Sequence, residues 1–171
     1  ENKLAKNKIV ATVMSNIGLH KKAESEGIEV VTTAVGDRYV LEAMLKQGLN
    51  LGGEQSGHIN FSDHSTTGDG LLTSLKLSLA LKKSNKKMSE LANIMKVFPQ
   101  LLVNVKVKTK EGFQDKENIQ NIIKEKEKQL GENGRILVRP SGTEPIIRVM
   151  GEGSCIIELE DIVNSIAEVV Y

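Results

Sequence analysis

Residues 139–150, RPSGTEPIIRVM, concentrate side chains that bind anions. The candidates are Arg139, Ser141, Gly142, Thr143 and Arg148. A guanidinium can donate two parallel hydrogen bonds to a phosphate, and the two hydroxyls add further donors. The glycine lets the backbone approach a ligand and permits a positive φ, while two prolines stiffen the loop. These properties predict a site for a phosphate monoester. The alternative is a rigid hairpin with surface arginines, which fits the composition equally well.

Residues 52–58, GGEQSGH, form a second group with chemical potential. The carboxylate of Glu54 can accept hydrogen bonds from two adjacent sugar hydroxyls, and Ser56 can donate or accept one. His58 titrates near neutral pH and can accept a proton. The glycines allow a tight turn that directs all three side chains toward one point. The alternative is an ordinary glycine turn that carries a surface histidine.

Composition argues against several classes of function. The 171 residues hold 23 basic and 22 acidic side chains, so the formal net charge is only +1. That balance and an aromatic content of 3% argue against nucleic-acid binding. No apolar run approaches the ~20 residues of a membrane span. A single cysteine, Cys155, suits a reducing compartment. We therefore expect a cytoplasmic protein without a membrane partner, in which Cys155 is incidental to function.

Strands and helices alternate through residues 1–98, which is typical of an α/β domain. The apolar runs predict buried strands within 8–16 and 28–35, each followed by a helix. Residues 49–61 predict two strands around the glycine turn. The glycine turn therefore joins strands of the predicted sheet.

Two aspartates are placed to cap helices of this domain. Asp37 precedes one helix, and Asp69, in the segment TTGDG, precedes another over 70–84. Capping explains Asp69 better than a role in binding does. Leucines occur on most faces of the helix over 70–84, which predicts that this helix is largely buried.

The pattern changes near residue 99 and predicts a smaller α+β domain over 99–171. The half-exposed strand LVNVKVK is followed by an amphipathic helix over 115–131, two short strands and a closing helix. The order βαββα indicates a small, mostly antiparallel sheet. The phosphate-binding candidates then lie in the loop between the two short strands.

Several segments together resemble the α-D-phosphohexomutases. In chain order they are ATVMSNIGL, VGDRYVLEAM, LGGEQSGHI, TTGDGLL and RPSGTEPIIRVM. The resemblance implies the third and fourth domains of a four-domain enzyme. These are an α/β three-layer domain at 1–98 that recognises the sugar, and a TATA-binding-protein-like α+β domain at 99–171 that binds phosphate.

The resemblance also implies roles for individual residues. Glu54 and Ser56 match the positions that hold sugar hydroxyls, and His58 matches a position of a proton acceptor. Arg38 lies where other members place residues that face the ligand. The loop residues Arg139, Ser141, Gly142, Thr143 and Arg148 match those that hold the phosphate that is not reacting.

Members of this family move a phosphoryl group between a phosphoserine and the sugar with the help of Mg²⁺. The motifs are most similar to those of members that interconvert glucosamine 6-phosphate and glucosamine 1-phosphate through glucosamine 1,6-bisphosphate. The phosphoserine loop and the aspartate-rich metal loop of the family do not occur in this sequence. We therefore expect the N-terminal domains of the same polypeptide as partners, and no turnover by this chain alone.

Two alternatives remain open. The chain can belong to a related mutase for glucose or mannose phosphates, or it can be a free-standing phosphosugar-binding module. The start at Glu1 rather than at methionine favours a piece of a longer polypeptide over the second alternative.

Overall fold

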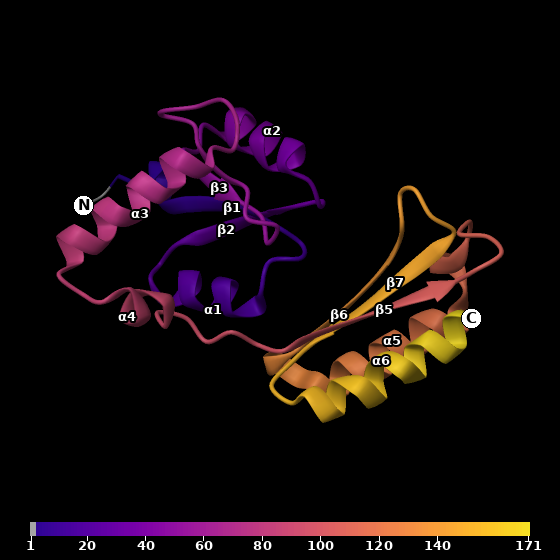
Figure 1. The fold of residues 1–171 in the computed structure, drawn as a ribbon. Helices are drawn as coiled ribbons and strands as arrows, with labels where there is room; N and C mark the ends of the chain where they lie inside the picture. The colour runs from indigo at the N-terminus through magenta and orange to yellow at the C-terminus, as the bar shows by residue number, and fades with distance from the viewer. Residues whose placement is uncertain (1–2) are drawn as a thin grey trace. The chain divides into compact units, whose positions relative to one another are not determined.

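The computed structural model of this chain describes residues 3–171. They divide into two compact units, one that extends to Val97 and one from Phe98 to Tyr171 (Figure 1). No helix in the described part of the chain is long and apolar enough to cross a membrane.

The first unit is built on a four-stranded sheet with the order β2-β1-β3-β4. Its strands are β1 (Lys8–Thr12), β2 (Glu29–Thr33), β3 (Leu51–Gly53) and β4 (Ile59–Phe61). Its helices are α1 (Ile17–Ser25), α2 (Asp37–Gln47), α3 (Gly70–Ser84), α4 (Met88–Ala92) and the short 3-10 helix η1 (Ala5–Asn7). Strand β1 pairs in parallel with β2 and β3, and β4 pairs antiparallel with β3. Helices α1 and α2 lie on opposite sides of the sheet (Figure 1), so the predicted α/β architecture is confirmed.

Helix α2 packs closely against the sheet. Its buried residues Val40 and Met44 meet Val10 of β1 and Leu49 in one apolar cluster. A Cβ on Gly52 would lie only 2.7 Å from both Met44 Sδ and Val40 Cγ1. Because real Cβ atoms do not approach that closely, a larger residue at position 52 would push α2 away from strand β3.

Helix α3 does not follow the prediction made from its composition. None of its residues is buried, and four leucines, at 71, 75, 77 and 79, are exposed. The prediction of a largely buried helix was wrong because leucines on most faces indicate an apolar helix without showing what covers it. Within the described residues, no strand or other helix packs extensively against α3.

One of the two predicted helix caps is correct. Asp69 is the N-cap of α3, where its carboxylate accepts a hydrogen bond from the N–H of Leu72 at 2.9 Å. For α2 the N-cap is Gly36, with φ 131°, so the prediction for Asp37 was wrong by one residue. Asp37 is the first helical residue and accepts from the Arg38 N–H at 2.8 Å. A carboxylate in the first turn still interacts favourably with the helix dipole.

The second unit is a three-stranded antiparallel sheet with the order β5-β7-β6. Its strands are β5 (Gln100–Lys106), β6 (Arg135–Pro140) and β7 (Ile146–Glu152). Its helices are α5 (Glu117–Leu130), α6 (Ile156–Val170) and the 3-10 helices η2 (Phe113–Asp115) and η3 (Gly131–Asn133). The predicted α+β unit with the order βαββα is confirmed.

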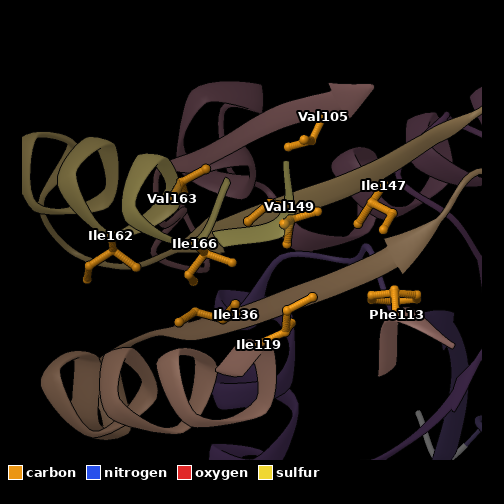
Figure 2. Packing of buried hydrophobic residues seen from close by; sticks show 10 residues of the cluster. Val105, Phe113, Ile119, Ile136, Ile147, Val149, Ile162, Val163 and Ile166 are labelled. Atoms are coloured by element: carbon orange, nitrogen blue, oxygen red, sulfur yellow. The ribbon is translucent and has the colours of Figure 1, made fainter. Parts of the chain in front are cut away.

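The core of this unit lies between the sheet and its two long helices. Figure 2 shows Ile119 of α5 and the α6 residues Ile162 and Ile166 in one apolar cluster with Val149 of the central strand. All four side chains have 0% exposure. Buried apolar residues spaced three and four positions apart give α6 one continuous apolar stripe, which explains why it covers the sheet; they are Leu159, Ile162, Val163, Ile166 and Val170.

The central strand also buries a carboxylate. Glu152 has 0% exposure and lies opposite Gln100 of β5 and Arg135 of β6. Arg135 Nε donates to Glu152 Oε2 at 2.7 Å, and Gln100 Nε2 donates to Oε1 at 3.0 Å. A buried charge is tolerated when it is paired and hydrogen-bonded in this way. The three residues therefore join all three strands at one end of the sheet.

We expect Arg135→Met to destabilise the second unit by about 3–5 kcal/mol, because it leaves the carboxylate of Glu152 buried without its charged partner. Urea unfolding followed by the amide resonances of residues 98–171 measures this loss. Arg38→Met, followed by the amide resonances of residues 3–97, is the matched control. Arg38 makes the same contact to Glu42, also at 2.7 Å, but its side chain is 82% exposed. Equal destabilisation by the two substitutions would contradict the role of burial.

Candidate functional site

The segment 54–58 forms a tight connection between β3 and β4. The N–H of Glu54 donates to the His58 carbonyl at 3.0 Å, and the N–H of Gly57 donates to the Glu54 carbonyl at 3.0 Å. Gly57 has φ 99°, a conformation that other residues rarely adopt. The predicted glycine turn is therefore present, and it is closed by its own backbone.

The turn brings the side chains of Glu54, Ser56 and His58 into mutual contact. Ser56 Oγ donates to Glu54 Oε1 at 2.6 Å. His58 Nδ1 lies 2.9 Å from Ser56 Oγ and 3.0 Å from Glu54 Oε1. The Glu54 side chain is only 10% exposed, whereas that of His58 is 56% exposed. The structure thus gathers these three predicted residues in one small polar cluster.

This cluster favours one tautomer of the imidazole. A carboxylate beside Nδ1 accepts the Nδ1 proton, which leaves the lone pair on Nε2, at the other side of the ring. An exposed Nε2 with a lone pair can accept a proton from a ligand hydroxyl. The geometry is therefore compatible with the role of proton acceptor that the sequence suggested for His58.

The cluster lies at the edge of the sheet where ligands bind in many α/β folds. Strands β1, β2 and β3 run parallel, so their carboxyl ends meet at one edge. The turn 54–58 follows β3 there, and α2 begins at the same edge after β2. Arg38 therefore shares an edge with Glu54, but its side chain pairs with Glu42 rather than with the cluster. This hydrogen bond and the charge of Glu42 raise the pKa of Arg38 above its ordinary value.

The segment TTGDG also reaches this region. A Cβ on Gly68 would lie 3.5 Å from the Cβ of His58 and 3.6 Å from Asn60 Oδ1. Asn60 is 2% exposed, and its Nδ2 has no hydrogen-bond partner among residues 3–171. The segment after β4 therefore packs beside the histidine, while Asp69 stays engaged as the cap of α3.

The second unit carries the other predicted site, in the loop between β6 and β7. Ser141 is buried, with 4% exposure, and its N–H donates to the Ile146 carbonyl at 2.9 Å. Its Oγ accepts from the N–H of Glu144 at 3.3 Å. Gly142 and Thr143 are exposed at the tip of the loop. The serine thus fixes the base of the loop from inside, and the glycine and threonine are open to a ligand.

Gly142 differs in one respect from the expectation. It does not adopt a positive φ, so the backbone conformation does not require glycine there. A Cβ on Gly142 would meet no atom within 4 Å. The absence of a side chain instead leaves open space beside the exposed loop, as a closely bound ligand requires.

Two arginines face each other at the base of this loop. The pairing of β6 with β7 places Arg139 directly opposite Arg148. Burial lowers the pKa of Arg139, and the positive charge of Arg148 lowers it further. Like charges directly opposite each other destabilise a sheet, and a bound anion would remove that repulsion.

The guanidinium of Arg148 has donors that are not fully used by residues 3–171. Its buried Nε has no partner in the described part of the chain, and its Nη2 reaches Glu144 Oε2 only at 3.5 Å. Glu144 is thus an acidic neighbour that would compete with a phosphate for Arg148. The contact is long and exposed, so it is worth little and can yield to an anion.

One contact at this loop was not predicted from the sequence. Lys110 Nζ donates to the carbonyl of Ser141 at 2.7 Å. The partner is a backbone atom 31 positions away, so no local motif marks the lysine. Only knowledge that the segment after β5 ends beside the loop would have singled it out.

No metal site is formed by the described residues. Across 3–171 the structure brings together no group of three His, Cys, Asp or Glu side chains suited to a metal ion. Cys155 is exposed just before α6.

An α/β unit followed by a small α+β unit is a combination that comparison with known families identifies. Residues 1–98 match the model of the phosphoglucomutase/phosphomannomutase alpha/beta/alpha domain III. Residues 102–169 match the model of the C-terminal domain of the same family. The chain therefore belongs to the phosphoglucomutase/phosphomannomutase family.

Individual relatives narrow the resemblance. The chain is 54% identical over 170 residues to the phosphoglucosamine mutase of Bacillus subtilis, and 52% identical over 168 residues to that of Geobacillus kaustophilus. These alignments cover 99% and 98% of this chain, but only 38% and 37% of the relatives. Among solved structures, Aspergillus fumigatus N-acetylphosphoglucosamine mutase in complex with GlcNAc-6P and magnesium has a TM-score of 0.82 at 20% identity. That match covers 98% of this chain and 42% of the other, and it shows the shared fold.

Arg148→Met tests whether the arginine pair is an anion site. Without ligand, we expect the thermal midpoint of the second unit to stay constant or rise, because the repulsion and the unsatisfied Nε are removed. Inorganic phosphate should raise the midpoint of the wild-type chain and leave that of the variant unchanged. Lys128→Met, on the exposed face of α5, removes the same charge and should keep the phosphate response. A phosphate response that survives in Arg148→Met would rule out the pair as the site.

Proposed function

We propose that this chain is the substrate-binding part of a phosphoglucosamine mutase. Glu54 and Ser56 bind hydroxyls of the sugar, and His58 accepts a proton from the hydroxyl that is phosphorylated. The loop binds the phosphate that is not reacting through Arg139, Ser141, Gly142, Thr143 and Arg148. The observation that carries the proposal is the hydrogen-bonded cluster of Glu54, Ser56 and His58, which leaves the far side of the imidazole free for a ligand.

The proposed reaction interconverts glucosamine 6-phosphate and glucosamine 1-phosphate. A phosphoserine gives its phosphoryl group to the free hydroxyl, which forms glucosamine 1,6-bisphosphate, and the serine then recovers the other phosphate. In this scheme the serine and the magnesium site belong to N-terminal domains of the same polypeptide. Mg²⁺ supplies charge neutralisation for phosphoryl transfer. The share of 38% that this chain covers in its Bacillus subtilis relative is consistent with such domains.

Arg38 is the least supported of the proposed ligand-binding residues. It lies at the correct edge of the sheet, but it would have to leave Glu42 to reach a ligand. The exposure of the pair makes that exchange inexpensive. We further propose a cytoplasmic location, since an unpaired, exposed Cys155 suits a reducing compartment.

Amide NMR of this chain during addition of glucosamine 1-phosphate tests the proposal directly. We expect shifts at residues 54–58 and at 139–148, whereas inorganic phosphate should shift only the second set. Glu54→Gln should abolish the shifts at 54–58, because the neutral amide is a weaker acceptor for hydroxyls. The matched control is Glu24→Gln, which alters an exposed carboxylate on α1. The absence of shifts at both loops at millimolar ligand would sink the proposal, and equal binding of glucose 1-phosphate would favour a glucose-phosphate mutase.

Gly142→Ala tests whether the open space beside Gly142 serves ligand binding rather than stability of the fold. The added methyl meets no protein atom within 4 Å, so the unfolding curve should not change. The methyl would occupy space that we assign to the phosphate, and the affinity for inorganic phosphate should fall about tenfold. Gly70→Ala is the control, since its Cβ also meets nothing within 4 Å but lies at the start of α3. Unchanged phosphate affinity in Gly142→Ala, measured by calorimetry, would place the phosphate elsewhere.

A further inference from the structure

The segment after β5 is attached to the phosphate loop at two points. Lys106, at the end of β5, lies opposite Ile146, at the start of β7, so both segments leave the sheet at the same end. The N–H of Val107 donates to the Pro145 carbonyl at 3.0 Å. Lys110 Nζ donates to the Ser141 carbonyl at 2.7 Å. The backbone bond holds one side of the loop, and the lysine holds the other.

The lysine contact fixes the orientation of one peptide group. In a trans peptide the C=O of one residue and the N–H of the next point in opposite directions. The chain has no cis peptide among its described residues. When the Ser141 carbonyl points toward Lys110, the N–H of Gly142 must therefore point away from the lysine. The described residues offer that N–H no acceptor, and Gly142 is exposed.

Lys110 also adds charge where the loop needs it. Its hydrogen-bond partner is a neutral carbonyl, so this contact does not neutralise the ammonium group. The half-buried lysine is the third cation at this loop, after Arg139 and Arg148. In a partly desolvated site a further positive charge attracts a phosphate more strongly than it would in water.

We propose that Lys110 is a positioning residue of the phosphate site. It holds the Ser141–Gly142 peptide so that the Gly142 N–H is presented to the anion before the anion arrives. The role of the contact in orienting the peptide follows from geometry alone, and only the identity of the ligand rests on the proposed function. The flanking lysine, Lys108, is exposed and makes no such contact within residues 3–171.

Three variants test this role in the intact chain. Lys110→Met removes the donor and the charge, Lys110→Arg keeps both, and Lys108→Met removes an equal charge from the same segment. In the ligand-free state, Lys110→Met should move the amide resonance of Gly142, while Lys108→Met should not. The affinity for inorganic phosphate should fall about 5- to 10-fold in Lys110→Met, which corresponds to the loss of one hydrogen bond. Lys110→Arg should restore most of it, and Lys108→Met should stay near the wild type.

The outcomes distinguish the positioning role of Lys110 from the proposed function of the whole site. An unmoved Gly142 amide in ligand-free Lys110→Met would overturn the positioning role, whatever the affinities are. Equal loss of affinity in Lys110→Met and Lys108→Met would also overturn it, since general charge would then explain both. A wild-type chain that binds no phosphate would overturn the proposed function itself. Unchanged resonances elsewhere in residues 98–171 show that the variants keep the fold.

Discussion

The pairing of the central strand β7 with its two neighbours determines the properties of the second unit. This register sets Glu152 opposite Arg135 and Gln100, and it sets Arg148 opposite Arg139. At the last residue of the strand a buried charge is compensated, and in its first half two like charges meet. A shift by one residue would turn every side chain of the strand to the other face. The stabilising pair and the repelling pair therefore depend on the same alignment.

The two loops differ in how they are prepared for a ligand. Glu54, Ser56 and His58 already bond to one another, so a sugar must exchange these hydrogen bonds for new ones. At the other loop the Nε of Arg148 lacks a partner among residues 3–171 and the arginines repel each other, so an anion would add interactions without displacing strong ones. In the proposed function, the loop between β6 and β7 would then contribute most of the affinity. The exchange at the turn 54–58 would contribute mainly discrimination, because a ligand without the right hydroxyls leaves polar groups unsatisfied.

Sequence patterns predicted most of what depends on nearby residues, although the cap of α2 is Gly36 rather than Asp37. The cap by Asp69, the closed turn at 54–58 and the closing helix α6 are local, and each is present. The exposure of α3 was not predictable, because burial depends on what covers a helix. The position of Arg139 opposite Arg148 could be predicted only from the register between β6 and β7. The sequences of such short strands do not define that register. To predict the contact of Lys110, one would need the strand register and the position of a backbone carbonyl. Residue types give no information about the latter.

The remaining question is why a glycine occupies the tip of the phosphate loop, when its φ is one that any residue adopts. Backbone strain is excluded as the reason, and so is crowding by the protein, since a Cβ there would meet no atom within 4 Å. The remaining explanation is the open space beside Gly142, which a side chain would occupy. The Ser141 carbonyl accepts from Lys110, so in the trans peptide the N–H of Gly142 points away from the lysine. A side chain at this position would narrow the approach to a donor that the fold has already oriented. In the proposed site, the lysine would therefore orient the Ser141–Gly142 peptide and the glycine would leave it accessible to an anion.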